Sequence, residues 1–296
     1  MLTSEMMHKV ENAPGFVAAL DQSGGSTPGA LEAYGVDRST FGSEAAMFDL
    51  IHAMRERIIL TPAFRGDRII GAILFEGTMD RAIAGVPAPS FLWEQRGVVP
   101  FVKVDQGLEA ERAGVQLMKP TPGLEDLLRH AWSLNVFGTK MRSVIRLADQ
   151  EGIDAVVDQQ FDLALLIARA GLVPIVEPEV LIASPVKADA ETCLRDALLR
   201  RLDQLDADTR IMLKLTIPVT PDLYRDLMAH DRVVRVLALS GGYDRSTACD
   251  RLALNHGMIA SFSRALIGDL REAMADEEFD SVFAAAVRQI YQASIV

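Results

Sequence analysis

Short apolar runs alternate with amphipathic segments along most of the chain, and most apolar runs end in a polar or glycine-rich turn. Eight of these runs are rich in Val, Ile, Leu and Ala and have few charges, as expected of strands that are covered on both faces in a parallel sheet. The predicted strands span residues 16–21, 69–75, 98–104, 136–142, 172–177, 210–218, 233–239 and 258–263. The polar residues before the first run are not assigned to an element.

Helical periodicity occupies most of the intervals between these strands. The predicted helices cover residues 30–34, 43–60, 78–84, 91–96, 123–134, 156–170, 188–205, 221–230 and 244–255, with more helix after residue 264. Eight strand–helix units in 296 residues, with no linker or low-complexity segment, predict a single-domain (β/α)8 TIM barrel over residues 1–296. An open Rossmann-like sheet is the alternative, but no Gly-x-Gly-x-x-Gly follows a predicted strand.

One predicted strand, residues 210–218, carries a lysine among apolar neighbours. Because both alternating faces of this strand are largely apolar, Lys214 is expected to lose water on folding, which disfavours its charged form. A neutral amine is the nucleophile that forms a Schiff base with a carbonyl group. The alternative is an ordinary lysine at a strand end whose ammonium group reaches solvent.

Polar side chains gather at the carboxyl ends of the predicted strands, where a barrel places its active site. Each one alone is typical of a solvated strand end, but together they converge on one mouth and favour a catalytic site for Schiff-base chemistry. The carboxylate pair Glu177 and Glu179 offers proton transfer, and Ser240 with two glycines, followed by Arg264, predicts a phosphate site. The full set is Asp21, Glu76, Lys103, Lys140, Arg142, Glu177, Glu179, Lys214, Ser240 and Arg264.

Composition narrows the function further. The net charge of −11 and the pI near 5.0 argue against a general affinity for nucleic acid or anionic membranes. Cys193 and Cys249 are too few for a disulfide framework, and the opening residues have no apolar core of a signal peptide. The five histidines are scattered without zinc-ligand spacing, so no metal and no cofactor are expected. We therefore expect a cytoplasmic enzyme.

Eight stretches carry a resemblance to a known family, and they follow one another in family order over residues 19–264. They are residues 19–26, 71–75, 102–105, 140–142, 173–179, 212–216, 239–242 and 261–264. Val-Pro-Ile-Val-Glu-Pro-Glu at 173–179, together with the buried lysine, is the specific part of this set. The chain resembles class I fructose-1,6-bisphosphate aldolase, the metal-independent type, and is most similar to its bacterial branch.

The resemblance implies a role for each catalytic residue. Lys214 would be the Schiff-base nucleophile, with Lys140 and Arg142 beside it. Glu177 would be the main proton shuttle, and Glu179 would position the lysines. The reaction would be reversible cleavage of fructose 1,6-bisphosphate to dihydroxyacetone phosphate and glyceraldehyde 3-phosphate. Tagatose bisphosphate or a related ketose phosphate remains open as the substrate, whereas the intact set of site residues disfavours a non-catalytic barrel.

The resemblance also implies how a phosphorylated sugar would be held. Asp21 would hold or deprotonate the hydroxyl at the scissile carbon, and Lys103 would help to bind the sugar. The phosphate nearest the ketone, here called the ketone-side phosphate, would contact Ser240, Gly241, Ser261 and Arg264. Animal members bind the distal phosphate with a Lys-Arg pair where this chain has Gly29 and Ala30, so Ser23 and Ser26 remain as donors. The sequence leaves open whether the chain forms a homo-oligomer.

Overall fold

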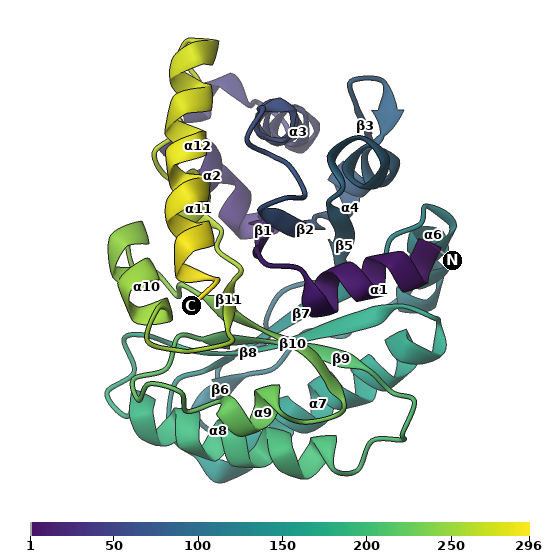
Figure 1. The fold of residues 1–296 in the computed structure, drawn as a ribbon, viewed down its shortest axis with the longest axis vertical. Helices are drawn as coiled ribbons and strands as arrows, with labels where there is room; N and C mark the ends of the chain where they lie inside the picture. Colours follow the sequence, from purple (N-terminus) through teal and green to yellow (C-terminus); the bar gives the residue numbers. More distant parts are fainter. Residues whose placement is uncertain (1) are drawn as a thin grey trace.

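Eight parallel strands form the centre of the molecule (Figure 1). A computed structural model describes residues 2–296. The strands neighbour one another in the order β1 (Phe16–Leu20), β2 (Ile69–Leu74), β5 (Val99–Lys103), β7 (Gly138–Ile145), β8 (Val173–Val180), β9 (Ile211–Thr216), β10 (Val233–Leu239) and β11 (Ile259–Ala260). Ala19 N, in β1, donates to Phe262 O just after β11 at 3.2 Å, so the first and last strands also meet. This arrangement confirms the predicted (β/α)8 barrel.

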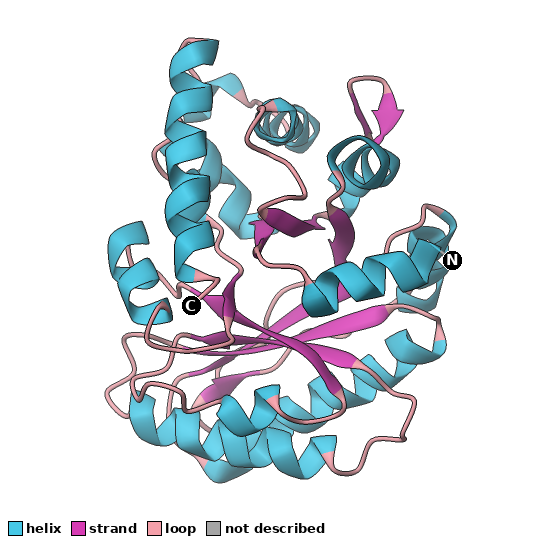
Figure 2. Ribbon diagram, viewed as in Figure 1, coloured by secondary structure: helices cyan, strands magenta, loops and turns pink. Residues whose placement is uncertain are grey.

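Helices surround the strands on the outside of the barrel (Figure 2). Every residue of β1, β2, β8 and β9 is buried, which is why these strands are almost uniformly apolar in sequence. The main outer helices are α2 (Thr27–Tyr34), α3 (Glu44–Leu60), α6 (Leu124–Ser133), α7 (Gln150–Arg169), α8 (Lys187–Leu202), α10 (Arg245–Leu252) and α12 (Asp276–Ala293). The shorter helices α5 (Ala88–Ser90), α9 (Arg225–Met228) and α11 (Arg264–Ile267) complete the layer.

Local capping explains where several helices begin. The Ser43 side chain accepts a hydrogen bond from Ala46 N, so α3 starts at Glu44, one residue after the predicted start. The Asp149 side chain accepts from Gly152 N in the same way, so α7 begins at Gln150, six residues before the predicted start. The first turn of α7 contains Gly152 and polar residues, so the hydrophobic periodicity did not indicate a helix there.

The helix predicted over residues 78–84 is wrong for most of its length. Helix α4 covers only Glu76–Met79, and the chain then forms a hairpin of β3 (Ala82–Ile83) and β4 (Val86–Pro87). The two residues between these strands, Ala84 and Gly85, have φ angles of 48° and 80°. Such left-handed angles at both central positions are what a tight hairpin turn requires.

The opening residues form a helix that the sequence reading did not assign. Helix α1 (Leu2–Asn12) contacts β2, β5 and β10 and lies across the amino-terminal end of the barrel (Figure 1). Met6 and Val10 are buried there in one cluster with Val17, Ile70, Val99, Val173, Val234 and Ile259. Met6 and Val10 are only two apolar residues in a polar segment, which is too weak a pattern to predict a helix. Their side chains nevertheless cover the amino-terminal end of the barrel.

A second missed element lies in the irregular segment after β5. Residues Val115–Gln116 form β6, which pairs antiparallel with the far end of β7. Across residues 2–296, none of the helices has the length and apolar character needed to cross a membrane.

Candidate active site

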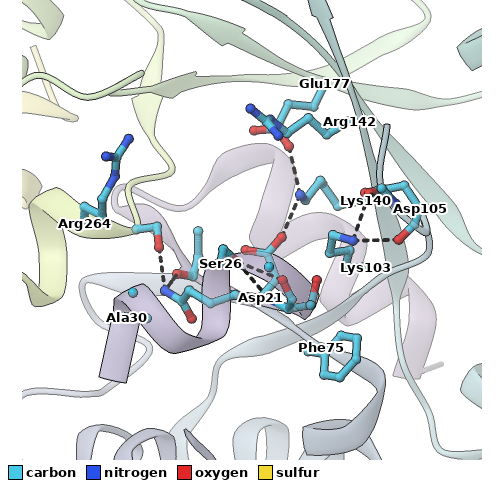
Figure 3. Close-up of a pocket in the computed structure, with 18 of the residues that line it drawn as sticks. Asp21, Ser26, Ala30, Phe75, Lys103, Asp105, Lys140, Arg142, Glu177 and Arg264 are labelled. Carbon is cyan, nitrogen blue, oxygen red and sulfur yellow. Dashed lines mark hydrogen bonds and ion pairs between the residues drawn. The ribbon is translucent and has the colours of Figure 1, made fainter. Parts of the chain in front are cut away.

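The carboxyl ends of the strands surround a cavity of about 1120 Å³ (Figure 3). All thirteen residues predicted for catalysis or substrate binding line it, together with Glu76. They are Asp21, Ser23, Ser26, Lys103, Lys140, Arg142, Glu177, Glu179, Lys214, Ser240, Gly241, Ser261 and Arg264. The structure therefore brings together residues that are up to 243 positions apart in the chain, from Asp21 to Arg264.

The alternation of strands β7 and β8 explains how the central side chains meet. Lys140 and Arg142 are two residues apart on β7, so both point to the same side. The parallel register places Arg142 opposite Glu177 and Val144 opposite Glu179 on β8. On the neighbouring pair of strands, Lys103 of β5 is in register with Lys140. The alternation of side chains along each strand, together with this register, therefore places the charged residues of β5, β7 and β8 on one surface.

At the centre of the cavity, two lysines and two carboxylates form a continuous chain of ion pairs. Glu177 Oε1 lies 3.0 Å from Lys214 Nζ, and its Oε2 lies 2.9 Å from Lys140 Nζ. Lys140 Nζ also lies 2.6 Å from Asp21 Oδ2 (Figure 3). Lys214, Lys140 and Glu177 are each no more than 4% exposed. The predicted nucleophile therefore directly contacts a buried carboxylate, as a proton shuttle requires.

Opposing electrostatic effects act on this cluster. Burial disfavours the charged forms, but the surplus of neighbouring opposite charge outweighs it. The pKa of Asp21 is lowered because Lys140, Lys214 and Lys103 overcome its burial. The pKa of Glu177 is lowered by the same two nearest lysines, and the pKa of Lys140 is raised by Asp21 and Glu177. At neutral pH, Lys140 is an ammonium ion held between two carboxylates.

Two further ion pairs flank the cluster. Arg142 Nε donates to Glu179 Oε2 at 2.5 Å, and Lys103 Nζ lies 2.8 Å from Asp105 Oδ1. Within residues 2–296, Arg142 is the ion-pair partner of Glu179, and no lysine pairs with it. Among the described residues, Glu179 therefore makes no direct ion pair with the lysines that it was predicted to position. Asp105 ends the Val-Lys-Val-Asp stretch at residues 102–105 but had no predicted role, and its position two residues after Lys103 was the available signal.

At the β10–β11 side of the cavity, several groups suit an anion. Ser240 is buried at the end of β10, and Gly241 and Gly242 follow with φ angles of 60° and 119°. A Cβ at Gly241 would lie 2.6 Å from Ile182 Cγ2, so a side chain is excluded there. The buried Ser261 Oγ has no hydrogen-bond partner within residues 2–296. Exposed Arg264 borders the same part of the cavity, as predicted.

The opposite side of the mouth, after β1, is less charged. Gly29 and Ala30 line the cavity there, so no side-chain cation comes from these two positions. Ser26 Oγ already donates to Ser23 O at 2.9 Å and accepts from Ser23 N at 3.1 Å. Lys119, which the sequence reading did not single out, also lines the cavity and has no ion-pair partner in the described part of the chain. An exposed lysine in an irregular segment gave no usable signal.

No group of three or more His, Cys, Asp and Glu side chains within residues 2–296 has a geometry that could hold a metal ion. Lys214 and Glu177 need no such group for amine chemistry, since the first supplies the nucleophile and the second lies within proton-transfer distance.

Comparisons with known proteins agree with this geometry. The family described as fructose-bisphosphate aldolase class-I matches residues 17–217. A fructose-bisphosphate aldolase class 1 of Synechocystis sp. is 52% identical over 291 residues, which cover 98% of this chain and 97% of that protein. The chain belongs to the class I fructose-bisphosphate aldolase family. The resemblance inferred from the eight stretches is thereby confirmed.

Two further comparisons also cover nearly the whole chain, one with a class 1 aldolase sequence and one with a solved fold. A fructose-bisphosphate aldolase class 1 of Porphyromonas gingivalis is 51% identical over 294 residues, covering 99% of this chain and all of that protein. The crystal structure of fructose-bisphosphate aldolase from Plasmodium falciparum, in complex with TRAP and a small-molecule inhibitor, superposes with a TM-score of 0.75. It is 20% identical and the match covers 99% of this chain and 94% of that one, so it supports the barrel fold.

Proposed function

We propose that this class I aldolase reversibly cleaves fructose 1,6-bisphosphate to dihydroxyacetone phosphate and glyceraldehyde 3-phosphate through a Schiff base on Lys214. The observation that carries the proposal is the buried contact of Lys214 Nζ with Glu177 Oε1 at 3.0 Å, with Lys140 on the other oxygen. Residues 1–296 would act as one catalytic barrel, and the substrate would be a phosphorylated sugar.

In the first step, the Lys214 ammonium group passes a proton to the neighbouring carboxylate, and the resulting neutral amine attacks the ketone carbon. The carbonyl oxygen takes up a proton, and the resulting carbinolamine loses water to give an iminium ion. Glu177 supplies and removes these protons because it contacts Nζ directly. The adjacent Lys140 ammonium holds Glu177 in place and stabilises negative charge that develops on the departing oxygen.

In the second step, the carbon–carbon bond breaks and its electron pair moves into the iminium group. The hydroxyl at the scissile carbon must lose its proton as the aldehyde forms, and Asp21 is the proposed acceptor. Lys140 lies 2.6 Å from Asp21 and fixes the carboxylate toward the cavity. The aldehyde leaves, the enamine is protonated at carbon, and water then releases dihydroxyacetone phosphate from Lys214.

The two phosphates are assigned to opposite sides of the mouth. The ketone-side phosphate would be held by Arg264, Ser240, Ser261 and the backbone N–H of Gly241. Lys103 would contact the sugar, and Arg142 and Glu179 would shape the wall beside it. Ser23 and Ser26 would contact the distal phosphate, with the Ser26 hydroxyl turning away from Ser23 O when an anion binds.

Steady-state cleavage assays with the two ketose bisphosphates that differ at C4, fructose and tagatose 1,6-bisphosphate, test the substrate. We expect the higher kcat/KM for the fructose compound, and a preference for tagatose bisphosphate would reassign the substrate while leaving the Schiff-base mechanism intact. Activity should survive exhaustive chelation. Loss of activity on chelation and recovery with zinc would instead indicate a metal that polarises the carbonyl. We further propose that the enzyme works in the cytoplasm, where Cys193 and Cys249 would stay reduced.

A further inference from the structure

Gln22, between the proposed base Asp21 and Ser23, connects the first strand to the phosphate side of the cavity. Its Nε2 donates to Ser263 Oγ at 2.5 Å, although the two residues are 241 positions apart. Arg55 Nη2 donates to the backbone oxygen of Gln22 and also lies 3.4 Å from Gln22 Oε1. Because a guanidinium group has no acceptor, the amide oxygen must face Arg55 and the amide nitrogen must face Ser263.

Arg55 is well placed to lock this amide. The side chain lies on α3 and is 1% exposed, and a second donor, Nη1, contacts Thr78 Oγ1 at 2.8 Å. Within residues 2–296 it forms no ion pair. Burial lowers the pKa of Arg55 to about 10, with Asp21 opposing the change, so the group stays charged at neutral pH. A buried cation without its own carboxylate depends on fixed oxygen acceptors such as those of Gln22.

Ser263 is left with one unused hydrogen-bonding function. It precedes α11, yet its side chain makes no capping bond to that helix, which is the usual use of a serine at such a position. Its oxygen accepts from Gln22, and its own hydroxyl proton has no acceptor within the described residues. Ser263 and Gln22 both line the cavity, and Arg264 is the next residue. The hydroxyl proton is therefore available to a ligand in the cavity.

We propose that Ser263 is a further ligand of the ketone-side phosphate and that Gln22, held by Arg55, is the positioning residue that orients the Ser263 hydroxyl to donate its proton. A bound phosphate near neutral pH offers mainly acceptor oxygens. The Ser263 oxygen already accepts from the Gln22 amide, while its proton has no acceptor among the described residues, so the hydroxyl is oriented to donate and meets that requirement. This inference rests on the proposed function, because that function places the ketone-side phosphate beside Arg264.

The test is anion binding rather than turnover. The dissociation constant of inorganic phosphate, and that of dihydroxyacetone phosphate, would be measured by calorimetry on the full chain and on Ser263→Ala. We expect Ser263→Ala to weaken both by about tenfold, as for a lost hydrogen bond to a charged group. Ser133→Ala is the matched control, since that hydroxyl contacts only His130 O on an exposed helix and should leave both constants unchanged.

Gln22→Glu tests the positioning role. A carboxylate at residue 22 has no N–H, so the Ser263 hydroxyl would donate to it and be lost to the phosphate. We expect a larger loss of phosphate binding than for Ser263→Ala in the otherwise natural chain. In the Gln22→Glu protein, Ser263 should already contribute little to phosphate binding. Adding Ser263→Ala to that variant should therefore change the dissociation constant little. If the glutamate variant does not fold, the same comparison is made with Gln22→Met, whose side chain also has no N–H, alone and combined with Ser263→Ala.

Unchanged phosphate binding in a folded Ser263→Ala protein would overturn the inference. So would equal effects of Ser263→Ala with and without Gln22→Glu. A natural chain that binds phosphate through Ser263 but cleaves no ketose bisphosphate would instead overturn the proposed function. The binding and turnover measurements thus separate the two failures.

Discussion

Two buried lysine–glutamate pairs in this barrel are built in opposite ways. The first, Lys187 and Glu191, lies on α8 outside the cavity. Lys187 donates to Glu191 Oε1 and to Ile217 O, and Glu191 Oε2 accepts from Val219 N at 2.9 Å. Burial lowers the pKa of Lys187 and raises that of Glu191, against the attraction between them. Each group has its own partner, and together they fix the loop that follows the Lys214 strand.

The second pair, Lys214 and Glu177, shares its partners with the rest of the cavity. Glu177 faces two lysines and Lys140 faces two carboxylates. Glu177 Oε2 lies 2.9 Å from Lys140 Nζ, but without the alignment of a hydrogen bond. Neighbouring charges dominate here, since the pKa of Glu177 is lowered and that of Lys140 is raised despite burial. We call Lys187–Glu191 a closed pair, because its members bond to each other and to fixed backbone groups, and it stabilises the fold. In the shared pair, Lys214–Glu177, a proton can move between members while each remaining charge still has a partner.

The largest expected effect comes from Lys214→Arg, which keeps the charge but removes the nucleophile. A guanidinium group stays protonated, so we expect no detectable cleavage while circular dichroism remains native. Borohydride added with dihydroxyacetone phosphate should label Lys214 in the natural chain and nothing in the variant, as read by peptide mass spectrometry. A label on Lys140 or Lys103 in the natural chain would show that the nucleophile has been misassigned.

Glu177→Gln tests the shared carboxylate. The amide keeps the shape but cannot shuttle protons, so we expect kcat to fall by about 10²- to 10⁴-fold. The matched variant at the closed pair, Glu191→Gln, should leave kcat within a few-fold of the natural chain. Steady-state kinetics of the two proteins side by side measure the contrast. A similar kcat for both variants would contradict the inference that the shared carboxylate acts in catalysis and the closed pair does not.

Glu191→Gln should instead act on stability. Losing one member of a buried ion pair leaves Lys187 uncompensated, so we expect a loss of about 3–5 kcal/mol in the free energy of unfolding. Urea denaturation followed by circular dichroism gives this value where unfolding is reversible. No destabilisation in this variant would mean that the pair on α8 is not a structural clamp.

Arg264 extends the comparison to a cation with no carboxylate partner in residues 2–296. Arg264→Ala should weaken fructose 1-phosphate and fructose 1,6-bisphosphate alike, by about 1.5–3 kcal/mol in kcat/KM, because both carry the ketone-side phosphate. The measurement is kcat/KM for the two substrates. Loss confined to the bisphosphate would place Arg264 at the distal phosphate and reverse the proposed orientation of the sugar.

Ser26 gives the smallest effect, because its hydroxyl is neutral and already bonded to Ser23. Ser26→Ala should reduce kcat/KM for the bisphosphate by about 0.5–1.5 kcal/mol and leave fructose 1-phosphate unchanged. The same pair of substrates serves as its internal control. An equal loss on both would indicate a general disturbance of the β1 loop.

The sequence was sufficient for the features that depend on local periodicity. Apolar runs located all eight barrel strands, and the residues at their ends, such as Lys140 and Glu177, could be placed at one mouth from fold rules alone. Features that depend on two remote segments were out of reach. Nothing near Gln22 indicates Ser263, and Arg55 resembles any outward-facing residue of an amphipathic helix until α3 is docked.

The contacts of Glu179 and Ser26 likewise could not be predicted from the sequence. Their positions followed from strand and loop spacing, but their partners did not. Glu179 bonds to Arg142 because parallel register brings β7 and β8 together, and register is a property of two strands rather than of one.

Met6 and Val10 of helix α1 pack against a core of buried side chains at the floor of the barrel, so the cavity above it opens only at the carboxyl ends of the strands. Every residue of the Lys214 strand β9 is buried, so the Schiff base would be reached from the mouth of the cavity rather than from the floor. Substrate and both products must also use that opening. The aldehyde half, which is not bonded to the protein, has to leave before the half that remains attached to Lys214. The covalent bond to Lys214 thus fixes the order in which the two products pass through the single opening.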